Sequence, residues 1–302
     1  MKGEASFLPV QTVANETMSE TVSIETLRRW IGKTAAAEDR VTPGPAHALA
    51  ATLDRDLQFA EGDPLPPPWH WLYFVSMSPM AETGPDGHPT RGGFLPPVPL
   101  PRRMWAGSRM EFFRPLRVGD SIRRVSEITT VSAKEGRSGP LVFVTVRHEI
   151  AGPDGPLLTE EHDIAYRDLA KPGEKAPPAK AAPRDPAWQR EIVADPVLLF
   201  RYSALTYNSH RIHYDHPYVT AVEGYPGLVV HGPLLATLLL DLLLRNQPQA
   251  VVTRFEFRAR FPLFDTTPFS VCGRPDPDRT TVNLWAQDAA AQLCMDATAM
   301  VA

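Results

Sequence analysis

The stretch Gly227-Leu-Val-Val-His-Gly-Pro-Leu-Leu-Ala-Thr-Leu-Leu-Leu-Asp-Leu-Leu-Leu, which ends at Leu244, predicts a loop that opens into one long helix. Pro233 is favoured in the first turn of a helix, and the residues after it are apolar on nearly every face. This run is interrupted by a threonine and an aspartate and is too short to cross a bilayer, which needs about 20 apolar residues. We therefore expect a helix that is buried inside a folded domain.

Strand-like segments surround this helix. In the segment that follows it, Phe255, Phe257 and Phe261 alternate with charged residues, as in a strand with one buried face. Met110-Glu-Phe-Phe-Arg-Pro-Leu in the first half has a similar pattern, which indicates two copies of one helix-plus-antiparallel-sheet unit. Further strands are predicted at 121–131, 141–150, 162–167, 270–274, 281–287 and 292–301, and helical spacing at 23–32, 46–59 and 196–205. The predicted fold class is α+β.

Proline-rich composition divides the chain. The 302 residues include 32 prolines, and the cluster in 171–187 has almost nothing that packs into a core, so it predicts an extended linker. We expect a first unit at 1–170, the linker at 171–187 and a second unit at 188–302. Only the second unit contains a polar, histidine-rich loop.

Charge and cysteine content exclude several classes of function. The net charge of −4, with 22% charged residues, is not typical of proteins that hold nucleic acid or an anionic membrane. Cys272 and Cys294 do not suggest a disulfide framework, and Glu4, Glu16 and Glu20 argue against a targeting segment at the start. We expect a cytoplasmic protein that acts on a small molecule.

The loop Tyr207-Asn-Ser-His-Arg-Ile-His-Tyr-Asp, residues 207–215, concentrates groups that transfer protons or donate hydrogen bonds. A histidine held beside a substrate serves as general acid or base near neutral pH. The alternative is metal binding by His210, His213, Asp215 and His216, but neither a Glu-x-x-His pattern nor a cysteine pair accompanies them. A purely structural loop is the third reading. We predict no metal and no cofactor.

Gly232 and Pro233 open the long helix directly after His231. The first N–H groups of a helix have no partner within it, so they can hold a developing negative oxygen. The alternative interpretation is that these two residues only mark the beginning of the helix. The nearby polar loop favours the interpretation as a binding site for a negative oxygen.

The loop 207–215, followed by Gly227-Leu-Val-Val-His-Gly-Pro, resembles the hydratase motif of the MaoC-like hotdog-fold dehydratases. The resemblance is specific over about 40 residues of the second half and architectural in the first. Within the family, the chain is most similar to the double-hotdog branch of hydroxyacyl-thioester dehydratase type 2 and mesaconyl-C4-CoA hydratase proteins. This implies two hotdog units in one chain, each with a long central helix wrapped by an antiparallel sheet.

The resemblance also implies roles for individual residues. His213 falls on the catalytic histidine, Gly232 on the glycine whose N–H binds the thioester oxygen, and Asn208 on the catalytic aspartate. An amide cannot take a proton from water, so Asn208 is expected to orient water instead. Arg211 stands where proline is usual, and either binds an acyl carboxylate or a CoA phosphate or is a solvated charge. Further substrate-binding candidates are His210, Tyr207, Gly227 and His231.

The implied activity is addition or removal of water at the 2,3 position of an enoyl- or 3-hydroxyacyl-thioester, such as conversion of mesaconyl-C4-CoA to citramalyl-CoA. Two alternatives remain open at this point: a hotdog acyl-CoA thioesterase and a non-catalytic acyl-CoA-binding or partner subunit. The expected partner is an acyl-CoA or an acyl carrier protein thioester, and the double-hotdog chains are expected to form a homodimer.

Overall fold

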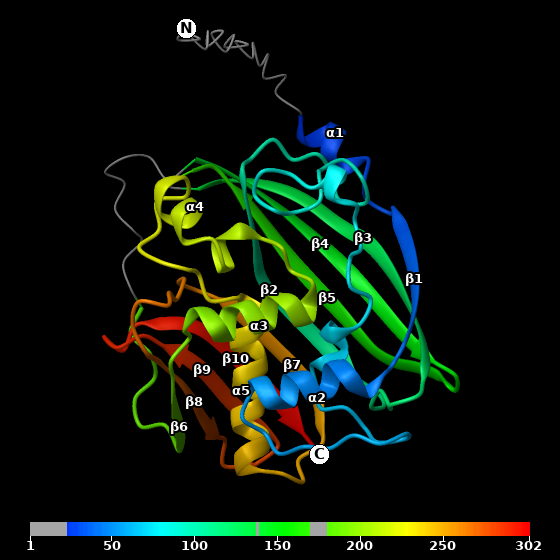
Figure 1. Cartoon of the computed structure of the whole chain (residues 1–302), viewed down its shortest axis with the longest axis vertical. Helices are drawn as coiled ribbons and strands as arrows, with labels where there is room; N and C mark the ends of the chain where they lie inside the picture. The colour runs from blue at the N-terminus through cyan, green and yellow to red at the C-terminus, as the bar shows by residue number, and fades with distance from the viewer. Residues whose placement is uncertain (1–22, 137–138, 170–179) are drawn as a thin grey trace, which may run out of the picture.

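The computed structural model describes residues 23–136, 139–169 and 180–302, which form one ten-stranded antiparallel sheet (Figure 1). The strand order is β1-β3-β4-β5-β2-β7-β10-β9-β8-β6. The first half contributes β1 (Thr34–Arg40), β2 (Arg102–Phe112), β3 (Ser121–Gly136), β4 (Gly139–Gly152) and β5 (Gly155–Arg167). The second half contributes β6 (Trp188–Ile192), β7 (Val252–Ala259), β8 (Phe269–Pro275), β9 (Thr281–Gln287) and β10 (Leu293–Val301).

The two halves of the sheet meet at β2 and β7. These strands contain the two segments of similar pattern, and they pair antiparallel with Met110 opposite Phe255. Gly107 allows this close approach, because a Cβ atom at that position would collide with the carbonyl oxygen of Phe257. The pairing makes one continuous sheet from strands that belong to residues 34–167 and 188–301.

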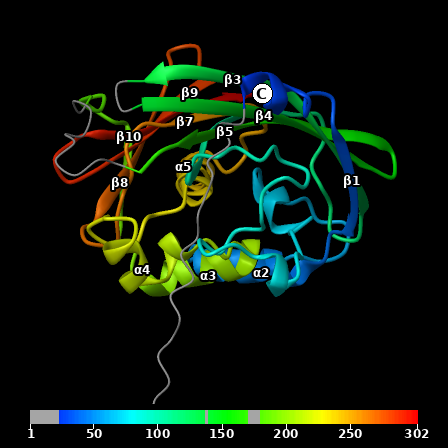
Figure 2. The same ribbon diagram turned by 90° about the horizontal axis from the view of Figure 1, so that it is seen from above.

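Helices α2, α3, α4 and α5 lie on the concave face of the sheet (Figure 2). Helix α5 lies inside the curve beneath the strands of the second half, and α2, α3 and α4 form a layer farther from the sheet. The helical segments are α1 (Ile24–Arg28), α2 (Pro43–Thr52), the 3-10 helices η1 (Trp69–Leu72) and η2 (Met80–Glu82), α3 (Pro196–Thr206), the 3-10 helix η3 (Arg211–His213), α4 (His216–Ala221) and α5 (Gly232–Asn246).

Helix α5 is the buried helix that the sequence predicts. Every residue from Leu234 to Leu243 is buried, and a fully buried leucine side chain stabilises the fold by about 2 kcal/mol. Asp241 within this run is surrounded by the guanidinium groups of Arg55, Arg190 and Arg245, at 3.6, 2.9 and 2.7 Å. The aspartate therefore ties α5 to both halves of the chain.

The first half differs from the expected long central helix. The longest helix described there is α2, with 10 residues, which packs against α3 and η1. The space beneath the sheet is filled instead by the apolar side chains of 59–74, including Phe59, Leu65 and Trp69. Prolines at 64, 66, 67 and 68 prevent a continuous helix through this segment.

Several element boundaries also differ from the expected ones, and the strand expected at 162–167, for example, begins at Gly155. The helix expected at 46–59 begins earlier and ends at Thr52, because Asp54 has a left-handed backbone with φ +53°. Residues 170–179, which contain most of the expected linker, lie outside the described residues. Beyond them, Ala182 is buried against Trp285, so the end of the expected linker packs on the second half.

No helix within 23–136, 139–169 or 180–302 is long and apolar enough to cross a membrane.

Candidate active site

The loop between α3 and α4 brings several of the predicted site residues together. Helix α3 begins where the Asp195 carboxylate accepts the N–H of Leu198 at 2.8 Å. It ends at Tyr207, whose left-handed backbone (φ +51°) turns the chain into the loop. Tyr207 is 58% exposed at this turn, whereas His210 and His213 point inward and are buried.

His213 has one ring nitrogen occupied and one available. Its Nδ1 lies 2.6 Å from the carbonyl oxygen of Val229, so Nδ1–H donates and the lone pair is on Nε2. Nε2 has no hydrogen-bond partner among the described residues. Burial lowers the pKa of His213 to about 4, although the hydrogen bond to Val229 acts in the opposite direction. The imidazole is therefore neutral near pH 7 and able to accept a proton on Nε2.

His231, directly before α5, lies against His213. The two rings stack with their centroids 3.7 Å apart and their planes 18° apart. Nε2 of His231 is 2.9 Å from the Ser203 hydroxyl, and the residue is completely buried. Burial, followed by the charges of His213 and His210, keeps its pKa well below the usual value. His231 thus supports the ring of His213 from behind, rather than lying at an open surface.

Asn208 is oriented by the backbone around it. Its Oδ1 accepts the N–H of His210 at 3.0 Å, and its own N–H donates to the Ser203 carbonyl at 2.8 Å. Because Oδ1 is the acceptor, the Nδ2 group is the donor that remains available. The side chain is partly exposed next to the buried histidines. It can therefore donate a hydrogen bond to a water molecule or a substrate oxygen, but it cannot remove a proton.

Gly232 is the first residue of α5, and Pro233 follows it without an N–H. The N–H of Gly232 has no partner among the described residues, and the positive end of the helix dipole lies here. A Cβ atom at this position would be 3.8 Å from the carbonyl oxygen of Trp105, so the start of the helix faces β2 at van der Waals distance. This arrangement suits an oxygen that gains negative charge.

A turn from the first half, residues 84–88, covers the polar loop. The Ser209 hydroxyl donates to the Gly87 carbonyl at 2.5 Å, and the N–H of Arg211 donates to the Asp86 carbonyl at 2.9 Å. Gly87 has φ +88°, and a Cβ there would lie 2.9 Å from the carbonyl carbon of Ser209 and closer to its oxygen. The position thus accepts only glycine without displacement. The first half fixes the position of the loop through this turn.

His88 of this turn contacts His210. Their ring centroids are 4.2 Å apart at 37°, and burial lowers the pKa of His210 to about 2. Asp86, His88 and His210 each have a potential ligand atom within 4.8 Å of the others. The metal alternative considered from the sequence grouped His210 with other residues of its own loop, whereas the structure brings it to two residues of the first half. The His88 and His210 imidazoles are in tilted contact, and the sequence prediction of no metal is not tested by this arrangement.

Arg211 is committed to local contacts. Its Nε and Nη2 donate to the Asp215 carboxylate at 2.9 and 2.7 Å, and its Nη1 donates to the Pro85 carbonyl at 3.0 Å. The guanidinium also lies 4.1 Å from the centre of the Tyr218 ring. Asp215 in turn caps α4 by accepting the N–H of Tyr218. Between the two interpretations of Arg211, these contacts favour a role in holding the loop.

Gly227 also has a backbone role. A Cβ there would collide with the Asp265 carboxylate and lie 2.7 Å from the methyl group of Thr266. Asp265 accepts the N–H of Leu228 at 2.8 Å and so fixes the segment that leads to Val229. Gly227 therefore helps to place the carbonyl that orients His213.

A second buried polar cluster lies on the concave face of the first half, and the sequence did not indicate it. The Glu160 carboxylate accepts hydrogen bonds from His70 at 3.0 Å, Trp71 at 3.1 Å and Ser108 at 2.8 Å. Burial opposes its ionisation, but the hydrogen bond and charge of His70 lower its pKa overall. Its partners are all internal, so the cluster holds the strands and η1 together.

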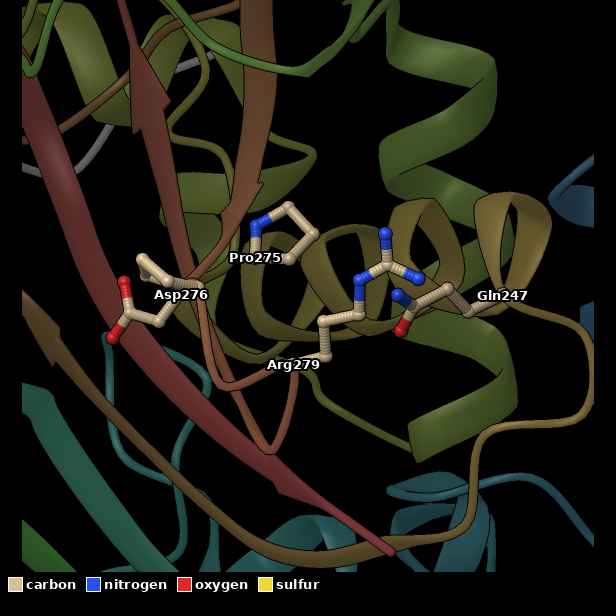
Figure 3. A pocket seen from close by; sticks show the side chains of 5 residues that line it. Gln247, Pro275, Asp276 and Arg279 are labelled. Atoms are coloured by element: carbon tan, nitrogen blue, oxygen red, sulfur yellow. The ribbon is translucent and has the colours of Figure 1, made fainter.

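A surface pocket lies at the other end of α5 (Figure 3). It is lined by Gln247, Pro275, Asp276, Pro277 and Arg279. The helix has 15 residues, so about 21 Å separate this pocket from Gly232. The pocket is therefore separate from the polar loop.

Comparisons with known proteins show the family of the chain. The family model for hydroxyacyl-thioester dehydratase type 2 matches residues 68–265. The chain is 47% identical over 265 residues to the mesaconyl-C(4)-CoA hydratase of Chloroflexus aurantiacus, covering 87% of this chain and 94% of the relative. It is 30% identical over 282 residues to the mitochondrial hydroxyacyl-thioester dehydratase type 2 of Schizosaccharomyces pombe, with 82% and 91% covered.

Solved structures show the fold. A MaoC-like dehydratase from Phytophthora capsici superposes with a TM-score of 0.68 at 16% identity, covering 93% of this chain and 98% of the other. A Mycobacterium tuberculosis protein described as a double hotdog superposes with a TM-score of 0.53 at 16% identity, with 90% and 96% covered. The expected α+β double-hotdog fold is thereby confirmed.

Proposed function

The chain belongs to the hydroxyacyl-thioester dehydratase type 2 family, and on this basis we propose that it is a hydro-lyase acting on acyl-CoA thioesters. It adds water to, or removes water from, the 2,3 position of an enoyl- or 3-hydroxyacyl-CoA. The leading substrate is mesaconyl-C4-CoA, the substrate named for the relative that is 47% identical over most of its length. The product of hydration is citramalyl-CoA.

The observation that carries the proposal is the state of His213. Its Nδ1–H is held by Val229 and its Nε2 is left as a base, and its ring stacks on His231, the residue directly before the helix start at Gly232. In hydration, Nε2 takes a proton from water while the water oxygen bonds to C3 of the enoyl group. The electron pair of the double bond moves toward the thioester oxygen, which the N–H of Gly232 stabilises. The proton then passes from Nε2 to C2, and dehydration is the reverse sequence.

Asn208 stands where the resemblance places a catalytic aspartate, which would be a second acid or base beside His213. Its Nδ2 donates a hydrogen bond to the attacking water and so points a lone pair of the water oxygen at C3. All proton transfer then depends on His213. This division of labour fits the low pKa of His213, because the ring has no carboxylate beside it to stabilise its protonated form.

The division of the chain into a scaffold unit at 1–170 and a catalytic unit at 188–302 is part of the proposal. Its support is the polar loop, which comes from the second half, and the turn at 84–88, which comes from the first. Both cysteines are buried free thiols, which supports a reducing compartment, and we propose the cytoplasm. The homodimer of double-hotdog chains stays a prediction.

Thioester hydrolysis is the rival reaction. Hotdog hydrolases usually place a carboxylate near the central helix, but here Asp215 and Glu223 are both paired with arginines, Arg211 and Arg102. The carboxylate at the end of the polar loop and that of Glu223 after α4 are thus already paired with cations. This observation favours hydration.

One assay separates the alternatives. Crotonyl-CoA and mesaconyl-C4-CoA are incubated with the protein, and enoyl absorbance and free thiol are followed separately. Loss of the enoyl band without thiol release is the expected result. Thiol release with an intact enoyl band would establish hydrolysis, and CoA-ester binding without either change would establish a non-catalytic binding protein.

A further inference from the structure

Arg103 lies close to the proposed site without a counter-charge. It is a half-buried residue of β2 that pairs with Tyr166 of β5, and Trp105 follows two positions along the same strand. Alternate residues of a strand share one face, so Arg103 and Trp105 both point to the concave side. The Trp105 carbonyl oxygen is the atom nearest to a Cβ at Gly232, which places the start of α5 about 7 Å along the strand from Arg103.

The other arginines of this region are occupied. Arg91 donates to the carbonyl oxygens of Val98 and Pro101 at 2.6 Å each. Arg102 pairs with Glu223 and Arg211 with Asp215. Arg103 alone among these four has no carboxylate or carbonyl partner within the described residues. A charge taken partly out of water normally requires such a partner.

A second polar group beside Arg103 has no strong partner of its own. The Tyr166 side chain is fully buried, and its hydroxyl makes no hydrogen bond of normal geometry among the described residues, only a weak interaction with Arg103 itself. Burial raises the pKa of Tyr166, and the charges of Arg103 and Arg91 and the interaction with the Arg103 guanidinium act against this rise. The charge of Arg103 also contributes, after burial, to the low pKa values of His88 and His210. The guanidinium therefore faces the same histidine cluster that adjoins His213.

We propose that Arg103 binds a carboxylate on the acyl chain of the substrate, with the Tyr166 hydroxyl as a second donor, and makes the enzyme selective for dicarboxylyl-CoA thioesters. The inference rests on the proposed function and adds the residue that selects the acyl group. A guanidinium binds a carboxylate through two parallel hydrogen bonds, which gives both orientation and affinity. An acyl group held at Gly232 by its thioester oxygen and at Arg103 by its far carboxylate has both ends fixed while C3 faces His213.

A CoA phosphate is the other anion that an arginine could hold. Arg103 is half-buried beside the start of α5 and the histidines, at the reacting end of the bound thioester. This position favours the acyl carboxylate. The two sources differ in one testable respect: every CoA ester has the phosphates, but only some have an acyl carboxylate.

The test compares Arg103→Met and Arg103→Lys with the wild type. Arg109→Met is the matched control, because Arg109 is on the same strand but on its outer face, where it pairs with Glu161 and Asp163. We expect Arg103→Met to lower kcat/KM for mesaconyl-C4-CoA by on the order of 10²–10³-fold and to change crotonyl-CoA hydration by less than about threefold. Arg103→Lys should be intermediate, and Arg109→Met should resemble the wild type. Thermal unfolding checks that each variant folds.

Equilibrium binding gives a readout that does not depend on turnover. Calorimetric titration with succinyl-CoA and butyryl-CoA should show a preference of the wild type for succinyl-CoA, and Arg103→Met should abolish this preference. Equal affinity of the wild type for the two esters would overturn the inference, and so would an equal loss of both in Arg103→Met, which indicates a phosphate contact. These outcomes apply even if the wild type proves to hydrate neither enoyl ester, which would refute the proposed function alone.

Discussion

Replacing Gly87 with alanine is expected to slow the reaction by far more than its loss of stability explains. The turn at 84–88 holds the polar loop through the Gly87 carbonyl, which accepts from the Ser209 hydroxyl at 2.5 Å. An added Cβ would lie 2.9 Å from the Ser209 carbonyl carbon and closer to its oxygen, whereas ordinary contacts begin near 3.4 Å. Relief of this overlap requires a displacement on the order of 1 Å, and such a misplacement can cost about 10²-fold in rate.

Gly62→Ala is the matched control for this variant. Gly62 has φ +85°, close to the φ +88° of Gly87, but a Cβ there would meet nothing within 4 Å. Both variants therefore have the same backbone strain, about 1–2 kcal/mol, and only Gly87→Ala has the collision. We expect both to unfold at slightly lower temperature than the wild type, and only Gly87→Ala to lose about 10²-fold in kcat.

The assay is the initial rate of enoyl absorbance loss with mesaconyl-C4-CoA, measured well below each variant's unfolding temperature. If Gly87→Ala hydrates its substrate as fast as Gly62→Ala, the turn does not position the loop and the reasoning is refuted. The same conclusion follows if the loss of rate in Gly87→Ala only parallels its unfolded fraction.

His213→Ala should lower the hydration rate by about 10²–10⁴-fold with little change in CoA-ester binding, measured by stopped-flow absorbance and calorimetry; near-native turnover would exclude His213 as the base. Asn208→Asp places a carboxylate close to that ring and should move the acidic limb of the kcat/KM profile to higher pH, whereas an unmoved limb would show that the two side chains do not interact. Because the folded pKa of His213, about 4, is below its unfolded value, the unfolded state takes up protons first as pH falls through 6.5. Urea unfolding should therefore show a loss of about 2 kcal/mol from this group between about pH 8 and 5, and a stability independent of pH would contradict its burial as a neutral ring. Dialysis against EDTA should leave hydration unchanged, since each proposed step uses a protein group; a loss that Zn²⁺ restores would instead show a working metal site, with Asp86, His88 and His210 as the ligands to replace first.

Local sequence patterns predict the elements in which the apolar residues themselves repeat with the period of a helix or a strand. The apolar run of α5 and the alternation of Phe255 and Phe257 each repeat with the period of the element that forms. Strands β1 and β6 were not predicted. Thr34–Arg40 consists mainly of alanine and charged residues, and its strand exists because it pairs with β3 at the edge of the sheet.

The sequence by itself determined the α+β class, the buried helix α5 and the loop that contains Asn208 and His213, because these are encoded by neighbouring residues. Only the tertiary structure decided which residues meet that loop. The contact of His88 with His210 and the approach of Gly232 to Trp105 each join positions more than 100 residues apart. Such contacts depend on strand register and on the pairing of β2 with β7, which the spacing of residues along the chain does not contain.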